Sequence, residues 1–220
     1  MYKSKAYKRN DSATIEVDNY ELRRLILESE NKNFEELQSK NQDLHFEYLD
    51  SELTKKTGIE VFNKDVLKTL DLYSDSNGYN NAAEILSDES KFPGIDVVRF
   101  GETINVFLKR KTFESQSIIK SYYDCLDMYR DYYQYEEIEG AVRNKVEAIP
   151  EEAFREAIAN AIVHRLWDVN AHIRVSMYDD HIEIVSPGGL PDGISEKDYL
   201  EGRVSILRNP ILANVFHRLD

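Results

Sequence analysis

The run from Glu151 to Gly193 constrains this chain more than any other stretch, because it sets an order of elements. Its letters, EEAFREAIANAIVHRLWDVNAHIRVSMYDDHIEIVSPGGLPDG, predict a helix, a strand, a turn at Asp179-Asp180, a second strand and a glycine-proline loop. On the helix, Glu156, Asn160 and His164 follow one another at intervals of four residues. That spacing places them on one polar stripe. We expect the stripe to line a cavity.

A second stripe of small apolar residues runs beside the polar one and includes Ala153, Ala157 and Ala161. A helix with alanines on one side can approach a neighbouring layer closely. We therefore expect this stripe to pack against a sheet, with the cavity next to the contact.

Bulk composition places the chain among ordinary globular proteins. It has 220 residues, 41% hydrophobic and 31% charged, enough for one large domain or two modest ones. No run of 18 apolar residues and no signal-peptide pattern is present, so we expect no membrane segment. Cys125 is the one cysteine, which excludes a disulfide within the chain and fits a reducing cytoplasm.

Charge limits the partners. The formal net charge is −13, from 41 acidic and 28 basic residues. Non-specific binding to a phosphate backbone depends on lysine and arginine displacing counterions. We therefore expect DNA to be bound only through parts of the protein outside this chain.

The chain divides at Phe92-Pro93-Gly94 into a helical part, residues 1–90, and an α/β part, residues 91–220. The helices predicted in the first part cover residues 20–29, 44–57, 64–72 and 82–87, with Asp43 and Asn63 as caps of the second and third. The elements predicted in the second part, outside the opening stretch, are strands 95–100 and 103–109 around a hairpin at Gly101-Glu102, a helix 115–135, a strand within 137–149, and a helix 211–219. The fold class is therefore α+β.

Tyrosines crowd the predicted helix 115–135, among them Tyr122, Tyr129 and Tyr133. Bases can stack on aromatic side chains, but such surfaces also need interleaved lysine or arginine. Few basic residues accompany these tyrosines, so we interpret them as a packed core face.

The polar stripe suits a magnesium–nucleotide site. Asparagine offers a carbonyl oxygen to a hard cation, glutamate can orient or deprotonate a water, and histidine can meet phosphate. The alternative is that Glu156 is merely solvated, Asn160 pairs with a loop and His164 packs at the helix end. Arg208 and Asn209 also have two interpretations: they meet an anion at the start of the last helix, or they tie a loop down.

Three segments together resemble a known family: EEAFREAIANAIVHRLWD, HIRVSMYDDHIEIVSPGGLPDGI and GRVSILRNPILANVFHRL. They are similar to the C-terminal region of RecG-like transcriptional regulators, a divergent GHKL, or Bergerat-fold, ATPase-like region. Such proteins carry a Schlafen/AlbA-like DNA-binding domain upstream. The resemblance implies a helix-on-sheet layer over residues 91–220, and a homodimer, since GHKL proteins commonly pair.

Site residues follow from the resemblance by position. Glu156 matches the N-box acid that acts on water, and Asn160 matches the magnesium-binding asparagine. His164 lies where the N box often ends. The loop at Ser186–Gly193, with Gly188, Gly189 and Gly193, stands where the first glycine box is found.

The sequence departs from the family pattern at two places. Ser186 begins the loop where GHKL proteins have an adenine-reading aspartate, and a second glycine box would fall beyond Leu219. The last predicted helix has no stop signal before Asp220, so we expect the natural protein to continue. No Walker lysine loop is present.

Three functions stay open at this point. The first is a nucleotide-sensing or partner-binding section of a bacterial cytoplasmic transcriptional regulator, with ATP and Mg²⁺ as ligands and weak or no hydrolysis. The second is a magnesium-dependent ATPase. The third is a structural dimerisation module whose site has decayed.

Overall fold

The computed structural model is a mixed α+β structure, as predicted. It describes residues 5–10, 13–30, 32–139, 142–190, 197, 201 and 206–219. The N-terminal part holds β1 (Tyr7–Asn10), β2 (Ala13–Glu16), α1 (Asn19–Ser29), the short 3₁₀ helix η1 (Phe34–Glu36), α2 (Glu47–Thr57), α3 (Lys64–Thr69), β3 (Tyr73–Ser74), β4 (Gly78–Tyr79) and α4 (Asn81–Leu86). The rest holds β5 (Ile95–Phe100), β6 (Phe107–Phe113), α5 (Ile118–Tyr133), β7 (Gln134–Glu139), β8 (Val142–Glu147), α6 (Glu151–Val163), β9 (Ile173–Met177), β10 (Ile182–Val185) and α8 (Pro210–Leu219).

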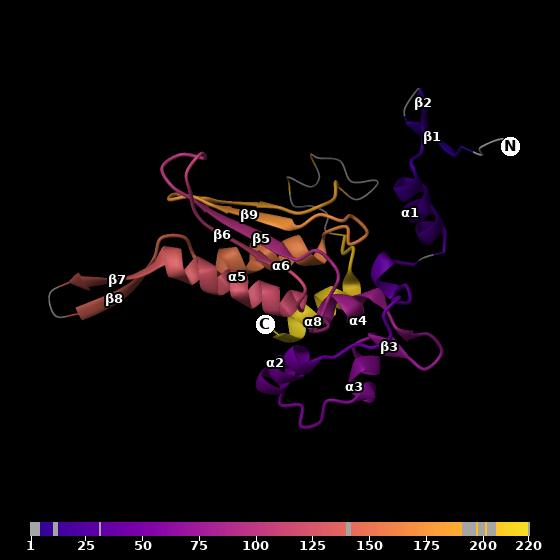
Figure 1. The fold of residues 1–220 in the computed structure, drawn as a ribbon, viewed down its shortest axis with the longest axis horizontal. Helices are drawn as coiled ribbons and strands as arrows, with labels where there is room; N and C mark the ends of the chain where they lie inside the picture. Colours follow the sequence, from indigo (N-terminus) through magenta and orange to yellow (C-terminus); the bar gives the residue numbers. More distant parts are fainter. Residues whose placement is uncertain are drawn as a thin grey trace.

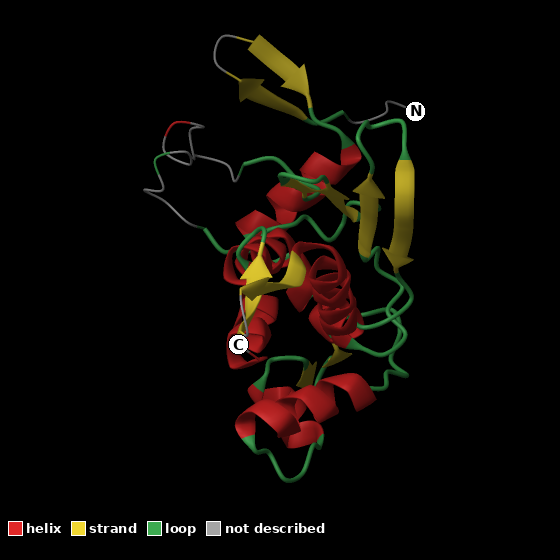
Figure 2. Cartoon of the chain, turned by 90° about the vertical axis from the view of Figure 1, so that its left-hand side faces the viewer, coloured by secondary structure: helices red, strands yellow, loops and turns green. Residues whose placement is uncertain are grey.

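The main sheet has four strands in the order β10-β9-β5-β6. The central pair, β5 and β9, is parallel, and both outer pairs are antiparallel. Alternation along the strands sends one set of side chains, including Val97 and Val175, into the core. The opposite set includes Asp96, which is held by Arg110 and Thr112 of the neighbouring strand. Helices cover one face of the sheet (Figure 2).

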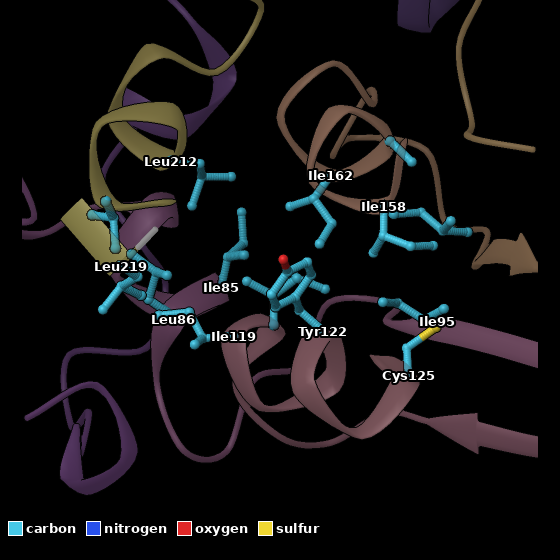
Figure 3. Packing of buried hydrophobic residues seen from close by; sticks show 14 of the residues in the cluster. Ile85, Leu86, Ile95, Ile119, Tyr122, Cys125, Ile158, Ile162, Leu212 and Leu219 are labelled. Atoms are coloured by element: carbon cyan, nitrogen blue, oxygen red, sulfur yellow. The ribbon is translucent and has the colours of Figure 1, made fainter. Parts of the chain in front are cut away.

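The core continues from the sheet through α5 and α6 to α8 and the N-terminal helices. Figure 3 shows these contributions: Ile95 from β5; Ile119, Tyr122 and Cys125 from α5; Ile158 and Ile162 from α6; Leu212 and Leu219 from α8; Ile85 and Leu86 from α4. The tyrosines of α5 are a core face, as predicted, with Tyr129 and Tyr133 at most 1% exposed. One apolar cluster thus fixes α5, α6 and α8 relative to one another.

The alanine stripe of α6 differs from the prediction. Ala153 and Ala157 are exposed, while Ala161 is buried beside Phe154 and Ile158. The larger apolar side chains of the helix face the core because they bury more surface than alanine. The polar stripe is therefore displaced toward α5 and α8.

Two β predictions also need correction. Strand β6 begins at Phe107 rather than Thr103, because residues 102–105 form a turn closed by the bond from the Val106 amide to the Thr103 carbonyl. The single strand predicted within residues 137–149 is instead a hairpin, β7–β8, which begins directly after α5. Figure 1 shows this hairpin projecting beyond the end of α5, away from the rest of the molecule.

Capping explains two helix boundaries. The Asn63 side chain accepts from the Asp65 and Val66 amides and starts α3, as predicted. Asp43 does not cap α2: the Asp88 carboxylate accepts from the Glu47 and Tyr48 amides instead. Among the described residues, no helix has the length and apolar character needed to cross a bilayer.

Candidate functional site

A groove of about 740 Å³ lies between α5, α6 and α8. Its apolar lining includes Tyr122, Val163 and Phe216, one from each helix. Its polar lining comprises Glu147, Glu151, Glu152, Arg155, Glu156, Asn160 and His217. Small-molecule sites are typically concave and mostly apolar, with a few polar groups, at about 300–1,000 Å³. The groove has the volume of such a site, but its lining is more polar than is typical.

Glu156 and Asn160 both line this groove. They lie one helical turn apart on α6, so their side chains share one side of the helix. Both residues are exposed. Within the part of the chain that the structure describes, neither side chain makes a hydrogen bond or ion pair. Two polar side chains on neighbouring turns therefore face the same groove, and both are available to bind a ligand.

The groove is acidic. Four of its lining residues are glutamates, whereas the lining contains one arginine, Arg155, and one histidine, His217. A hydrogen bond from Arg130 lowers the pKa of Glu151 and keeps it ionised at neutral pH. An anionic ligand would therefore need a cation to enter with it. Over the described residues, no group of three or more His, Cys, Asp or Glu side chains could hold a metal by itself.

The remaining predicted site residues form a separate cluster at the C-terminal end of α6. The Arg208 guanidinium donates to the His164 carbonyl at 3.0 Å and to the Gly189 carbonyl. Gly188 has φ +124°, and a Cβ there would lie 2.9 Å from the Arg208 Nη1 and from Leu166 Cγ. A side chain at Gly188 would thus be both strained and crowded. Gly193 lies outside the described residues.

Arg208 therefore ties the glycine loop to α6, which was the second of its two interpretations. Asn209 ties the start of α8 to the end of α6 from a buried position, donating to the Val163 and Arg165 carbonyls. Ser186 donates to the Ala161 carbonyl. The last carbonyls of a helix have no partner within the helix. Here side chains from the loop and from the start of α8 satisfy them.

The start of α8 is occupied by the protein's own carboxylate. Glu35 is fully buried, and its two oxygens accept from the Ile211 and Leu212 amides at 2.7 and 3.1 Å. A helix N-terminus attracts an anion. The carboxylate of Glu35, 176 residues earlier in the chain, takes that place, so this helix end does not bind a phosphate.

His164 is half-buried at the C-terminal end of α6, beside Arg208 and outside the lining of the groove. Burial, together with the Arg208 charge, lowers the pKa of His164 below its ordinary value. The imidazole is neutral at pH 7. Any contact of His164 with a phosphate would accordingly be a hydrogen bond and not an ion pair.

Two structural residues, Glu35 and Arg165, were not predicted from the sequence. Arg165 is fully buried and donates to the Pro93, Val169 and Ala171 carbonyls, with its guanidinium carbon 4.1 Å from the centre of the Trp167 ring. A charged side chain gives no sign in a single sequence that it is buried. Asn209, by contrast, was predicted either to meet an anion or to tie a loop down, and its two hydrogen bonds to backbone carbonyls favour the second.

Comparison with known proteins bears on the C-terminal part. Residues 170–220 match the family described as "Putative ATP-dependent DNA helicase recG C-terminal". This segment, which contains β9, β10 and α8, is thus similar to an ATPase-like region of RecG-like proteins. The match begins after α6, so it does not extend to Glu156 and Asn160. Among curated proteins, none matches the chain.

A solved structure shares the fold over nearly the whole chain. It is the crystal structure of the DIP2311 protein from Corynebacterium diphtheriae, with a TM-score of 0.71 at 20% sequence identity. The likeness covers 98% of this chain and 45% of that chain. This chain therefore spans less than half the length of the protein it matches in fold.

Proposed function

We propose that this chain is the nucleotide-sensing or partner-binding section of a bacterial RecG-like transcriptional regulator. Its ligand is ATP with Mg²⁺, and the site binds the nucleotide with weak or no hydrolysis. One observation carries the proposal: Glu156 and Asn160 face one groove with unpaired side chains, on the helix directly before an ATPase-like segment.

The lining residues fit a magnesium nucleotide in size and in chemistry. Asn160 has the amide oxygen that a hard cation prefers, and the four glutamates favour a ligand that brings a divalent cation. The partly buried ring of Phe216 offers flat apolar surface to a base. Mg²⁺, when bound with the nucleotide, neutralises phosphate charge.

Weak hydrolysis follows from the chain's own residues. Ser186 stands where the related ATPases have an adenine-reading aspartate, and its hydroxyl is engaged by the Ala161 carbonyl. Gly188 and Gly189 belong to the loop held by Arg208 and do not line the groove. Glu156 lines the groove one turn from Asn160, where it could orient a water. The runner-up function, a magnesium-dependent ATPase, rests on this same residue.

Calorimetric titration with ATP in the presence and absence of Mg²⁺ tests the proposal. We expect magnesium-dependent binding to the parent and at least tenfold weaker binding to Asn160→Ala, about 1.4 kcal/mol. Asn170→Ala is the matched control, because Asn170 is exposed and outside the groove. No heat at millimolar nucleotide would refute the nucleotide site, and equal binding by both variants would remove Asn160 from it.

Phosphate release distinguishes sensing from catalysis. We expect turnover at or near background for the parent. Sustained turnover that is abolished in Glu156→Gln but kept in Glu60→Gln would favour the ATPase. The regulatory part of the proposal predicts little DNA binding by this chain alone, because of its charge of −13. A salt-dependent mobility shift measures it, and tight binding at moderate salt would contradict that part.

A further inference from the structure

The β7–β8 hairpin is a two-stranded sheet with no third strand among the described elements. Two strands alone are marginally stable in water. Two large apolar side chains of this hairpin are in solvent, with Ile138 71% and Tyr135 48% exposed. The hairpin extends beyond the end of α5 and away from the main sheet (Figure 1). These features are typical of a segment whose stabilising partner lies outside its own chain.

Strand β6 presents the second unpaired edge. It is the outermost strand of the main sheet and pairs with β5 alone in the described part of the chain. Phe107 and Leu108, at its start, are 63% and 59% exposed. Open edges of this kind are templates for pairing with another strand, and proteins usually protect them with charge.

The charges on the two edges are opposite. Strand β6 carries Lys109, Arg110 and Lys111 in succession, and β7 carries Glu136 and Glu137. The other hairpin strand, β8, carries Arg143 and Lys145, so it does not complement β6. Pairing of β6 with β6, or of β7 with β7, would bring like charges together. Pairing of β7 with β6 brings opposite charges together, which stabilises cross-strand neighbours.

Both edges meet at one corner of the molecule. The Lys109 Nζ lies 3.7 Å from an Asp131 oxygen and 5.5 Å from the centre of the Tyr132 ring, and β7 begins at Gln134. Within one chain, however, the hairpin leads away from β6. A two-fold axis beside this corner would bring the hairpin of each copy to the β6 edge of the other. Such an exchange is closed and symmetric, so it ends at a dimer.

We propose that two copies of this chain dimerise by exchanging β7–β8 hairpins, with β7 of each copy pairing along β6 of the other. The four-stranded sheet of each copy gains two strands, and the exposed Phe107, Leu108 and Ile138 side chains become covered. This mode is strand addition to a sheet edge. It does not depend on whether the groove binds a nucleotide.

Sedimentation velocity over a concentration series reaching hundreds of micromolar measures the assembly. We expect a reversible dimer whose dissociation constant rises with salt. The double variant Glu136→Lys with Glu137→Lys reverses the charge of the β7 strand. The double variant Lys109→Glu with Lys111→Glu reverses the charge of the β6 edge. Each double variant alone should have a dissociation constant at least about tenfold higher than the parent.

The decisive measurement mixes the two double variants. In the mixed pair, the basic hairpin of one chain meets the acidic edge of the other, and the acidic hairpin meets the basic edge. The mixture should therefore dimerise as the parent does, although each variant alone does not. Asp43→Lys with Glu60→Lys changes the net charge by the same amount as the hairpin variant, at exposed sites elsewhere, and should dimerise like the parent. Circular dichroism confirms that all variants fold. A monomeric parent, unaltered dimerisation of either double variant, or a monomeric mixture would overturn the proposal.

Discussion

The two ends of the exposed side of α6 differ in how their polar groups are used. At the C-terminal end, Asn209, Arg208 and Ser186 all donate to carbonyls of the helix or of the residues just after it. One to two turns earlier, the Glu156 and Asn160 side chains face a groove without partners among the described residues. One helix thus combines two regions. We call the C-terminal end, whose carbonyls accept from Ser186, Arg208 and Asn209, the fastened end, and the pair Glu156 and Asn160 the open strip.

This difference separates stabilising residues from residues available to a ligand. A side chain already bonded to buried carbonyls cannot turn to a ligand without leaving those carbonyls unsatisfied. An exposed, unpaired side chain stabilises the fold little and can bind at small cost. If this comparison is correct, substitutions at the fastened end will lower stability and those on the open strip will not.

The largest loss of stability is expected for Arg165→Ala. Arg165 is fully buried, its guanidinium satisfies three backbone carbonyls, and it packs on Trp167. Burial lowers its pKa to about 10, so it stays protonated at neutral pH. Removing it leaves a cavity and takes the donor from three partly buried carbonyls, and we expect a loss of about 4 kcal/mol in the free energy of unfolding.

Urea denaturation measures this change. Arg174→Ala is the matched control, because Arg174 is exposed on β9, and it should change the free energy of unfolding by less than about 0.5 kcal/mol. Similar losses for both variants would show that the buried arginine is not a principal support of the loop after α6.

The next largest effect concerns pH and Glu35. Burial raises the pKa of Glu35 to about 7 from an ordinary 4.5, in spite of the two amides it accepts from. Below pH 4.5 the carboxyl is protonated in both the folded and unfolded states. As the pH rises from 4.5 toward 7, Glu35 ionises in the unfolded chain but stays largely protonated in the folded protein. The free energy of unfolding therefore falls over this pH range. The loss attributable to Glu35 is about 3 kcal/mol and is complete above pH 7.

Glu35→Gln should remove this part of the pH dependence, since a glutamine oxygen can still accept from α8 but does not ionise. Denaturation at several pH values between 4.5 and 7.5 gives the slope. Glu60→Gln, at an exposed position, should keep the slope of the parent. A Glu35→Gln protein with an unchanged slope would show that Glu35 does not titrate in this range.

A smaller loss is expected for Asn209→Ala. The amide group donates to two carbonyls at the end of α6 and is 3% exposed. We expect the free energy of unfolding to fall by about 2 kcal/mol. Asn214→Ala, also on the α8 segment, removes only one exposed contact with Arg218 and should have little effect. If the two alanine variants unfold alike in thermal melts, Asn209 is not a clamp.

Local signals predicted the elements that rely on local contacts. The Asn63 cap, the proline at the start of α8, and the apolar alternation of β9 and β10 each reside within a few residues. Strand β8 lies within the strand predicted at 137–149, but its partner β7 was missed, because both faces of the hairpin contact solvent and the alternation that marks a strand is absent. Strand β6 was predicted to begin too early because Ile104 and Val106 are residues that favour strands, although here they lie in an exposed turn.

Periodicity alone also brought Glu156 and Asn160 to one side of α6, and the groove confirms that they share a surface. It could not place His164, which lies at the helix end against Arg208 and not on the groove. The contact of Glu35 with α8 spans 176 residues. Such pairings arise from packing of the whole core, which short-range patterns do not contain.

The smallest change in stability is expected on the open strip, and it completes the comparison. Asn160→Ala and Glu156→Gln remove no hydrogen bond of the described structure, and both positions are exposed. We expect each to change the free energy of unfolding by less than about 0.5 kcal/mol. The measurement is urea denaturation without nucleotide, in parallel with Asn209→Ala. A loss comparable to that of Asn209→Ala would mean that the strip supports the fold. Small losses combined with weakened nucleotide binding would instead indicate that these side chains contact the ligand. A substitution that leaves the fold unchanged has no indirect route by which to weaken nucleotide binding at a distant site.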